Sequence, residues 1–192
     1  MKNLKNLCFL FILSWTFIDC SSAQDKKPID LSPKPNAEAN KFESKEGNFS
    51  INISQSPFMT RNVGSELVDK KGINTGKQFG WKLEKISYTA MYSLEDISNE
   101  DSMAQLFSAM NIGVRKGILN QGFKLISEKE ISYGKHPGRE FHSISSNGVN
   151  FITRNYLIND MGYQISGIYV DEKDEKEVLE VLDSFRLLND KK

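Results

Sequence analysis

Apolar and polar residues alternate with a period of two in several short segments, which is the pattern of half-buried β-strands. Two of these segments lie at 49–53 and 86–92. Four more follow one another at about 123–133, 138–146, 149–158 and 162–170. Because short turns separate the last four, they predict an antiparallel meander. Asn147-Gly148 lies between two of them, and both residues tolerate the positive φ of a type I′ hairpin turn.

Two segments have helical periodicity instead. The first carries one apolar stripe, formed by Met103, Leu106, Phe107, Met110, Val114 and Ile118. Ser98 and Asp101 resemble a capping box at its start. The second begins at about Asp174 and carries Val178, Val181, Leu182, Phe185 and Leu188 on one face. Each stripe needs a surface to cover it, and one face of the sheet supplies that surface.

Together these segments predict an α+β fold with an antiparallel sheet of about six to seven strands and two helices. The expected order is two to three strands, a helix, the four-stranded meander and a C-terminal helix. About 150 residues from position 41 onward are enough for one hydrophobic core of normal size. We therefore expect a single domain at 41–190.

The N-terminus has the pattern of a secretory signal peptide at 1–23. Lys2 and Lys5 precede an apolar run at 7–18, which is too short to span a ~30 Å hydrocarbon core. Ser21-Ser22-Ala23 then places small residues before a cut at Gln24. Export is therefore expected, to the periplasm, the medium or the envelope.

Cys20 offers a second processing site, because a cysteine after an apolar run is acylated in bacterial lipoproteins. Asp19 opposes this interpretation, since that signal normally has a small residue before the cysteine. If Cys20 is acylated, the lipid anchors the protein to a membrane that it does not span. Residues 24–40 contain Pro28, Pro33 and Pro35 and no apolar periodicity, so they predict a flexible linker.

Composition excludes several classes of protein. The 25 basic and 25 acidic residues balance, which gives no overall field to attract nucleic acid. The two cysteines, Cys8 and Cys20, both precede Gln24, so a chain cut there has no disulfide, thiol nucleophile or cysteine-bound zinc. No cofactor or metal is expected.

Four segments resemble an exported bacterial domain related to PsbP, the extrinsic photosystem II protein. They are EGNFSI at 46–51, KHPGREF at 135–141, RNYLINDMGYQISGIY at 154–169 and LDSFRLL at 182–188. The resemblance covers most of residues 42–188. It implies the PsbP fold and an envelope location, and it supplies no catalytic residue.

Catalytic chemistry has few candidates. His136 and His142 are the two histidines, and a metal or catalytic role requires a third partner such as Glu140 or Glu130. The alternative is that both histidines are ordinary turn and strand residues. A hydrolase or metal-dependent enzyme using His136, His142 and Glu140 therefore remains the alternative to a non-catalytic protein.

Binding has more candidates. Pairing through Asn147-Gly148 brings Arg139 and Glu140 within reach of Arg154 or Tyr156, where an arginine can form a structural ion pair or hold an anion. Trp81 ends a glycine-rich segment with Gly72, Gly76 and Gly80, which we expect to form a mobile connection. The segment departs from a phosphate-binding loop because only three residues separate its first glycines.

Two further features bear on partners. All six tyrosines fall in predicted strands, and on an open sheet face they would form a docking surface together with Trp81. The acidic residues at 171–177 favour a helix N-terminus, and we interpret them as a cap. The sequence thus predicts an exported protein that binds a partner protein or small ligand. Its speculative site comprises Trp81, His136, Arg139, Arg154 and Tyr156.

Overall fold

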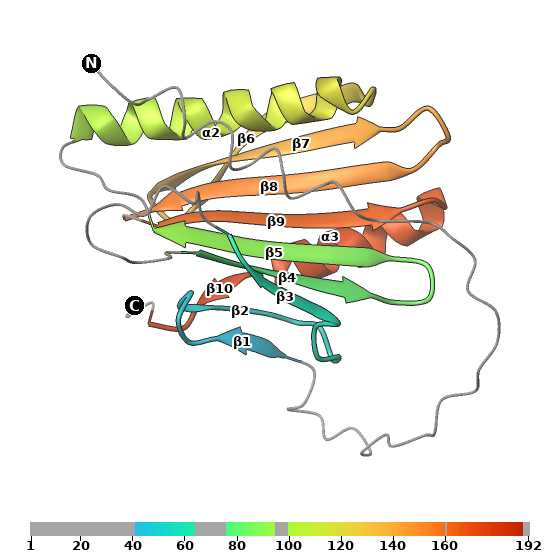
Figure 1. Ribbon diagram of the computed structural model, residues 1–192, viewed down its shortest axis with the longest axis horizontal. Coiled ribbons are helices and arrows are strands. Elements are labelled where there is room, and N and C mark those ends of the chain that lie inside the picture. The colour runs from blue at the N-terminus through green and yellow to red at the C-terminus, as the bar shows by residue number, and fades with distance from the viewer. Residues whose placement is uncertain (1–40, 64–75, 95–99, 160, 190–192) are drawn as a thin grey trace.

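The computed structural model describes residues 41–63, 76–94, 100–159 and 161–189 (Figure 1). The expected signal peptide at 1–23 and linker at 24–40 lie outside the described residues. So do Gly72 and Ser98.

The predicted meander is confirmed. Its four strands are β6 (Lys124–Tyr133), β7 (His136–Ile144), β8 (Asn150–Ile158) and β9 (Met161–Tyr169). Three further strands extend the sheet beyond β9: β5 (Ser87–Leu94), β4 (Gly76–Lys82) and β3 (Met59–Asn62). The resulting seven-stranded sheet is antiparallel throughout, in the order β3-β4-β5-β9-β8-β7-β6.

A second, three-stranded sheet packs on the first. It consists of β1 (Phe42–Ser44), β2 (Phe49–Ile51) and β10 (Arg186–Leu187), with β2 in the middle. Only β2 was predicted, because β1 and β10 are too short to show alternation. The predicted order therefore needs correction: five strands precede the first helix, and one short strand follows the last helix.

The two helices cover opposite faces of the large sheet. Helix α2 (Glu100–Asn120) packs on β6 and β8, whereas α3 (Glu175–Asp183) packs on β9, preceded by the 3₁₀ turn η2 (Glu172–Asp174). Along β8, Ile152, Arg154 and Tyr156 point to the side of α3, and Thr153, Asn155 and Leu157 to the side of α2. We call these sides the α3 face and the α2 face.

The C-terminal helix is shorter than its apolar stripe predicted. It ends at Asp183, and the next residues enter the small sheet, where Arg186 pairs with Ser50 and Leu187 with Phe49. Ser184 stabilises the change of direction, since its Oγ accepts a hydrogen bond from the Asn52 amide at 2.8 Å. The helical spacing of the apolar residues continues past the helix because the same core covers both elements.

The segment expected to be a mobile connection is the inner strand β4. Gly76 is there because a Cβ at this position would lie 2.5 Å from the Tyr92 carbonyl oxygen on β5. The glycines therefore permit close approach of strands, and the interpretation as a mobile connection was wrong for Gly76 and Gly80.

The hairpin at Asn147-Gly148 is confirmed, but its turn is not type I′. A hydrogen bond joins the Gly148 amide to the Ser145 carbonyl, and Gly148 alone of the pair has positive φ, at 83°. Strand β7 ends at Ile144 and β8 begins at Asn150, so the connection is longer than two residues.

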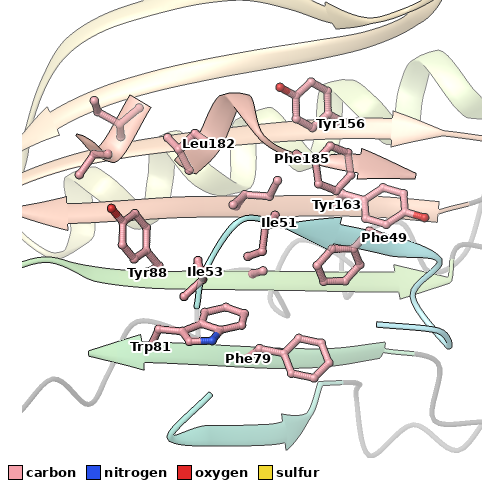
Figure 2. Packing of buried hydrophobic residues seen from close by; sticks show 14 of the residues in the cluster. Phe49, Ile51, Ile53, Phe79, Trp81, Tyr88, Tyr156, Tyr163, Leu182 and Phe185 are labelled. Atoms are coloured by element: carbon pink, nitrogen blue, oxygen red, sulfur yellow. The ribbon is translucent and has the colours of Figure 1, made fainter. Parts of the chain in front are cut away.

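The main core lies between the α3 face, the small sheet and α3 (Figure 2). Phe49 links several of its aromatic residues, with the ring centres of Phe79, Tyr163 and Phe185 within 6.1 Å of its own. Gly167 lets α3 approach β9, because a Cβ there would lie 2.3 Å from Val178 Cγ1. In the described part of the chain, no helix has the length and apolar character needed to cross a membrane.

Candidate functional site

Trp81 and Tyr156, two of the predicted binding residues, are core residues. Trp81 is 1% exposed, and its Nε1 donates a hydrogen bond to the Gln55 carbonyl at 3.0 Å. The Tyr156 ring stacks on Phe185 with the ring centres 5.5 Å apart. Neither side chain offers a surface to a partner, which corrects the sequence-based expectation.

The tyrosines were correctly placed in strands, but the docking surface built on them is absent among the described residues. Five of the six are buried, and Tyr133 is partly buried against the same core. The Tyr92 hydroxyl donates a hydrogen bond to Glu46 at 3.2 Å. Burial, and to a smaller extent this contact with Glu46, raises the pKa of Tyr92 to about 12. These rings contribute to the stability of the α3 face, and the described tyrosines offer no surface to a partner.

Arg154 forms a structural ion-pair network on the α3 face. Its Nε donates to Glu140 at 2.6 Å, and its Nη1 donates to Asp183 at the end of α3, also at 2.6 Å. Lys129 approaches the other Glu140 oxygen at 2.8 Å. Burial raises the pKa of Glu140, but hydrogen bonds from Lys129 and Arg154, together with their charges, outweigh it and hold the pKa below its ordinary value.

Arg139 does not join this network, because consecutive residues of a strand point to opposite faces. It lies on the α2 face, where its Nη2 is 3.2 Å from Glu130 and its Nη1 is 3.4 Å from Glu128. Glu128 also receives the Nε of Arg115 on α2 at 2.6 Å. The expected grouping of Arg139 with Glu140 and Arg154 is therefore wrong, and the part played by Arg115 was not predicted.

The structure does not bring the two histidines together. His136 and His142 lie six residues apart on β7, which at about 3.3 Å per residue separates them by about 20 Å. Glu140 lies between them but is held by Arg154 and Lys129. His142 Nε2 lies 3.5 Å from the Tyr169 hydroxyl. Within the described ranges, no three His, Cys, Asp or Glu side chains are grouped as metal ligands.

The acidic segment at 171–177 acts partly as predicted. Asp171 is the N-cap of η2, where its carboxylate accepts a hydrogen bond from the Lys173 amide at 3.3 Å. Glu175 and Glu177 occupy the first turn of α3, where negative charge is favourable. Cap formation accounts for this cluster without a ligand.

A row of polar side chains crosses the α2 face from one edge of the sheet to the other. Each residue pairs with the next one on the neighbouring strand, so the row follows the register directly. From β3 to β6 its members are Arg61, Gln78, Met91, Gln164, Asn155, Arg139 and Glu130. Six of the seven are polar, although the inner members are buried.

The inner part of this row has hydrogen-bonding atoms without partners in the described structure. Asn155 is fully buried, yet neither its Nδ2 nor its Oδ1 is paired. The same holds for Oε1 of Gln164, Nε of Arg139 and Oδ1 of Asn111 on α2. These five atoms are a majority of the seven such side-chain atoms in the described ranges. Because each one costs about 1–3 kcal/mol, their concentration in one place calls for an explanation.

We infer from the packing of α2 that Asn111 faces the same part of the sheet. Met110 and Leu106 pack on Leu157, and one turn later Val114 and Ile118 pack on Phe141. Phe141 pairs with Thr153, so Asn155 lies on β8 between the position that faces Phe141 and Leu157. On the helix, Asn111 lies between Met110, which packs on Leu157, and Val114, which packs on Phe141. We call Asn111, Arg139, Asn155 and Gln164 the amide site. It is a polar layer between two small apolar clusters.

The amide site was missed at the sequence level, although a signal for it exists. Asn155 and Gln164 are amide residues in the interior of two mainly apolar strands, and a register with Arg139 opposite Asn155 aligns them. The expected register placed Phe141 near 152–155, and the structure pairs it with Thr153. The contribution of α2 was not foreseeable, since helix packing decides which residue of the helix faces this layer.

Comparison with known proteins identifies the fold. No family model matches the sequence, and no curated protein matches it. Cyanobacterial PsbP (CyanoP) from Synechocystis has a similar structure, with a TM-score of 0.51 and 7% identity over 82% of this chain and 98% of that one. The Ran-binding protein Mog1p of Saccharomyces cerevisiae matches with a TM-score of 0.40 and 14% identity over 77% of this chain and 94% of that one. The chain has a PsbP-like fold.

Proposed function

We propose that this is an exported envelope protein whose PsbP-like domain binds a small ligand or partner protein without catalysing a reaction. The amide site is the observation that supports it. Buried amides with unpartnered atoms are costly to the fold, so a binding role explains their presence better than packing does. Side-chain amides neither gain nor lose protons near neutral pH, so they can hold a ligand but cannot act as general acid or base.

The residues that could perform catalysis are arranged unfavourably for it. About 20 Å separates the histidines along β7, and Glu140 is engaged in two ion pairs. An enzyme using all three would need a rearrangement of the sheet. For this reason we favour the non-catalytic function over a hydrolase or metal-dependent enzyme.

Export and the binding role can be tested in one experiment on the tagged protein in its native cells. After mild cross-linking and capture, mass spectrometry identifies the bound molecules and the N-terminal peptide. We expect a chain that begins at Gln24 or at acylated Cys20. A chain retaining Met1 in the cytosolic fraction would contradict export.

The non-catalytic part of the proposal needs its own measurement. The purified protein is assayed with general ester, phosphoester and peptide substrates, beside a His142→Ala variant. We expect no turnover above background for either. Turnover that disappears with His142→Ala would show that the protein is an enzyme.

A further inference from the structure

The amide site also indicates which class of ligand it accepts. We propose that it binds a small uncharged molecule that donates and accepts hydrogen bonds at adjacent atoms, either a carboxamide or a polyol. This inference rests on the proposed binding function, because it names the ligand chemistry of the same site.

The unpartnered atoms define the hydrogen bonds that a ligand must make. Three are acceptors: Oδ1 of Asn111, Oδ1 of Asn155 and Oε1 of Gln164. Two are donors: Nδ2 of Asn155 and Nε of Arg139. A molecule that only accepts, or only donates, leaves part of this set unpaired. A carboxamide or a pair of adjacent hydroxyls satisfies both kinds.

The charges around the site argue against an ionic ligand. Arg115 and Arg139 face Glu128 and Glu130, so two positive and two negative side chains balance locally. The hydrogen bond from Arg115 lowers the pKa of Glu128. Burial opposes this effect, but the positive charges of Arg115 and Arg139 add to it, so Glu128 stays ionised. A bound carboxylate or ammonium would add an unbalanced charge to a partly buried place, which is unfavourable.

Helix α2 packs on β6 and β8, so it borders the site on the strand that carries Asn155. In the described ranges the buried apolar contact of α2 consists of two clusters with three buried residues each, whereas the core on the α3 face has eighteen. The polar layer lies between these two clusters and weakens the contact of α2 with the sheet. A modest shift of α2 away from β8 would therefore admit a small molecule at limited cost.

Ordered water is the smallest molecule with the same hydrogen-bonding character, so the test must separate it from a ligand. The side-chain amide NMR signals of Asn155 and Gln164 report on the site directly. Isotope-labelled protein is titrated with acetamide, with glucose and with acetate, which is the charged analogue of acetamide. We expect saturable shifts with one or both neutral probes and none with acetate.

The two neutral probes distinguish the sources of this chemistry: a response to acetamide alone indicates a carboxamide, and a response to glucose alone indicates a polyol. An equal response to acetate would overturn the inference. So would amide signals that respond to neither neutral probe but show magnetisation transfer from long-lived water, because water alone would then occupy the site.

Variants connect the signal to the site. Asn155→Leu removes one donor and one acceptor, and we expect it to abolish the saturable shift at Gln164. Gln164→Met provides the same test at Asn155 should the first variant fold poorly. Thr153→Val is the matched control, since it changes the same face of β8 two residues away and should keep the response. Retention of binding by folded Asn155→Leu would overturn the assignment.

The experiments distinguish a wrong ligand class from a wrong binding function. If the probes do not bind but native capture recovers a stoichiometric partner, the binding function stands and the ligand class is wrong. If neither occurs, both are wrong.

Discussion

Arg154 and Asn155 are neighbours on β8, yet their environments are opposite. Arg154 points to the α3 face, where both ends of its guanidinium reach carboxylates. Asn155 points to the α2 face, where no described group pairs with its amide. The same contrast extends over the whole sheet. The α3 face is a large aromatic core stabilised by a closed ion-pair network, and the α2 face has a polar row between two small apolar clusters.

The difference shows how one sheet can place its paired, stabilising contacts on one face and unpartnered polar groups on the other. Because side chains alternate along a strand, a sheet can concentrate apolar burial on one face and keep polar groups on the other. On the α3 face the buried polar groups of Arg154 and Glu140 are paired. On the α2 face unpartnered groups persist, and we attribute them to function.

The largest effect is expected from breaking the network on the α3 face. Arg154→Leu leaves Glu140 buried without its closest counter-charge, which should cost about 3–5 kcal/mol of unfolding free energy. Urea unfolding measures this change. A loss below about 1 kcal/mol would mean that Lys129 alone satisfies Glu140 and that the two faces differ less than we infer.

A second comparison uses the same substitution on both faces. Gly167→Ala places a methyl group 2.3 Å from Val178 Cγ1 on the α3 face. We therefore expect the free energy of unfolding to fall by about 1–3 kcal/mol. Gly117→Ala on α2 meets nothing within 4 Å and should stabilise the helix by roughly 0.5–1 kcal/mol. Thermal unfolding of the two variants gives both values. Equal changes would contradict the difference in packing.

Acid should weaken the α3 face through Glu140. Because the pKa of Glu140 is lower in the folded state, its stabilising contribution is present at neutral pH and is lost as pH falls below the ordinary value of 4.5. Unfolding measured from neutral to acidic pH should therefore be less pH-dependent in Glu140→Gln than in the parent protein. An unchanged pH dependence would indicate that other carboxylates, such as Glu128, dominate.

The smallest effect is expected at Asn155. Replacing its unpartnered amide with an apolar group of similar size should leave stability unchanged within about 1 kcal/mol, or raise it. The thermal midpoint of Asn155→Leu gives the answer. A large loss would show that Asn155 has partners in solution, such as ordered water, that contribute to folding.

The sequence determined the elements with strong periodicity. The meander at 123–170, the strand that begins near Phe49 and the long helix were all predictable, because alternation and helical stripes reflect burial on one side of a local element. The resemblance to PsbP gave the fold correctly. Very short strands such as β1 and β10 could not be predicted, since three or two residues carry no period.

Only the tertiary structure decided the candidate site. Trp81 and Tyr156 have large aromatic side chains of the kind found in binding sites. Packing of the small sheet and α3 placed them in the core. Gly76 suggested flexibility, whereas the close approach of β5 required its small size. Asn111 could be grouped with Asn155 and Gln164 only from the way α2 packs on the sheet. Periodicity tells which residues share a face, but the partners across that face depend on contacts between segments far apart in the chain.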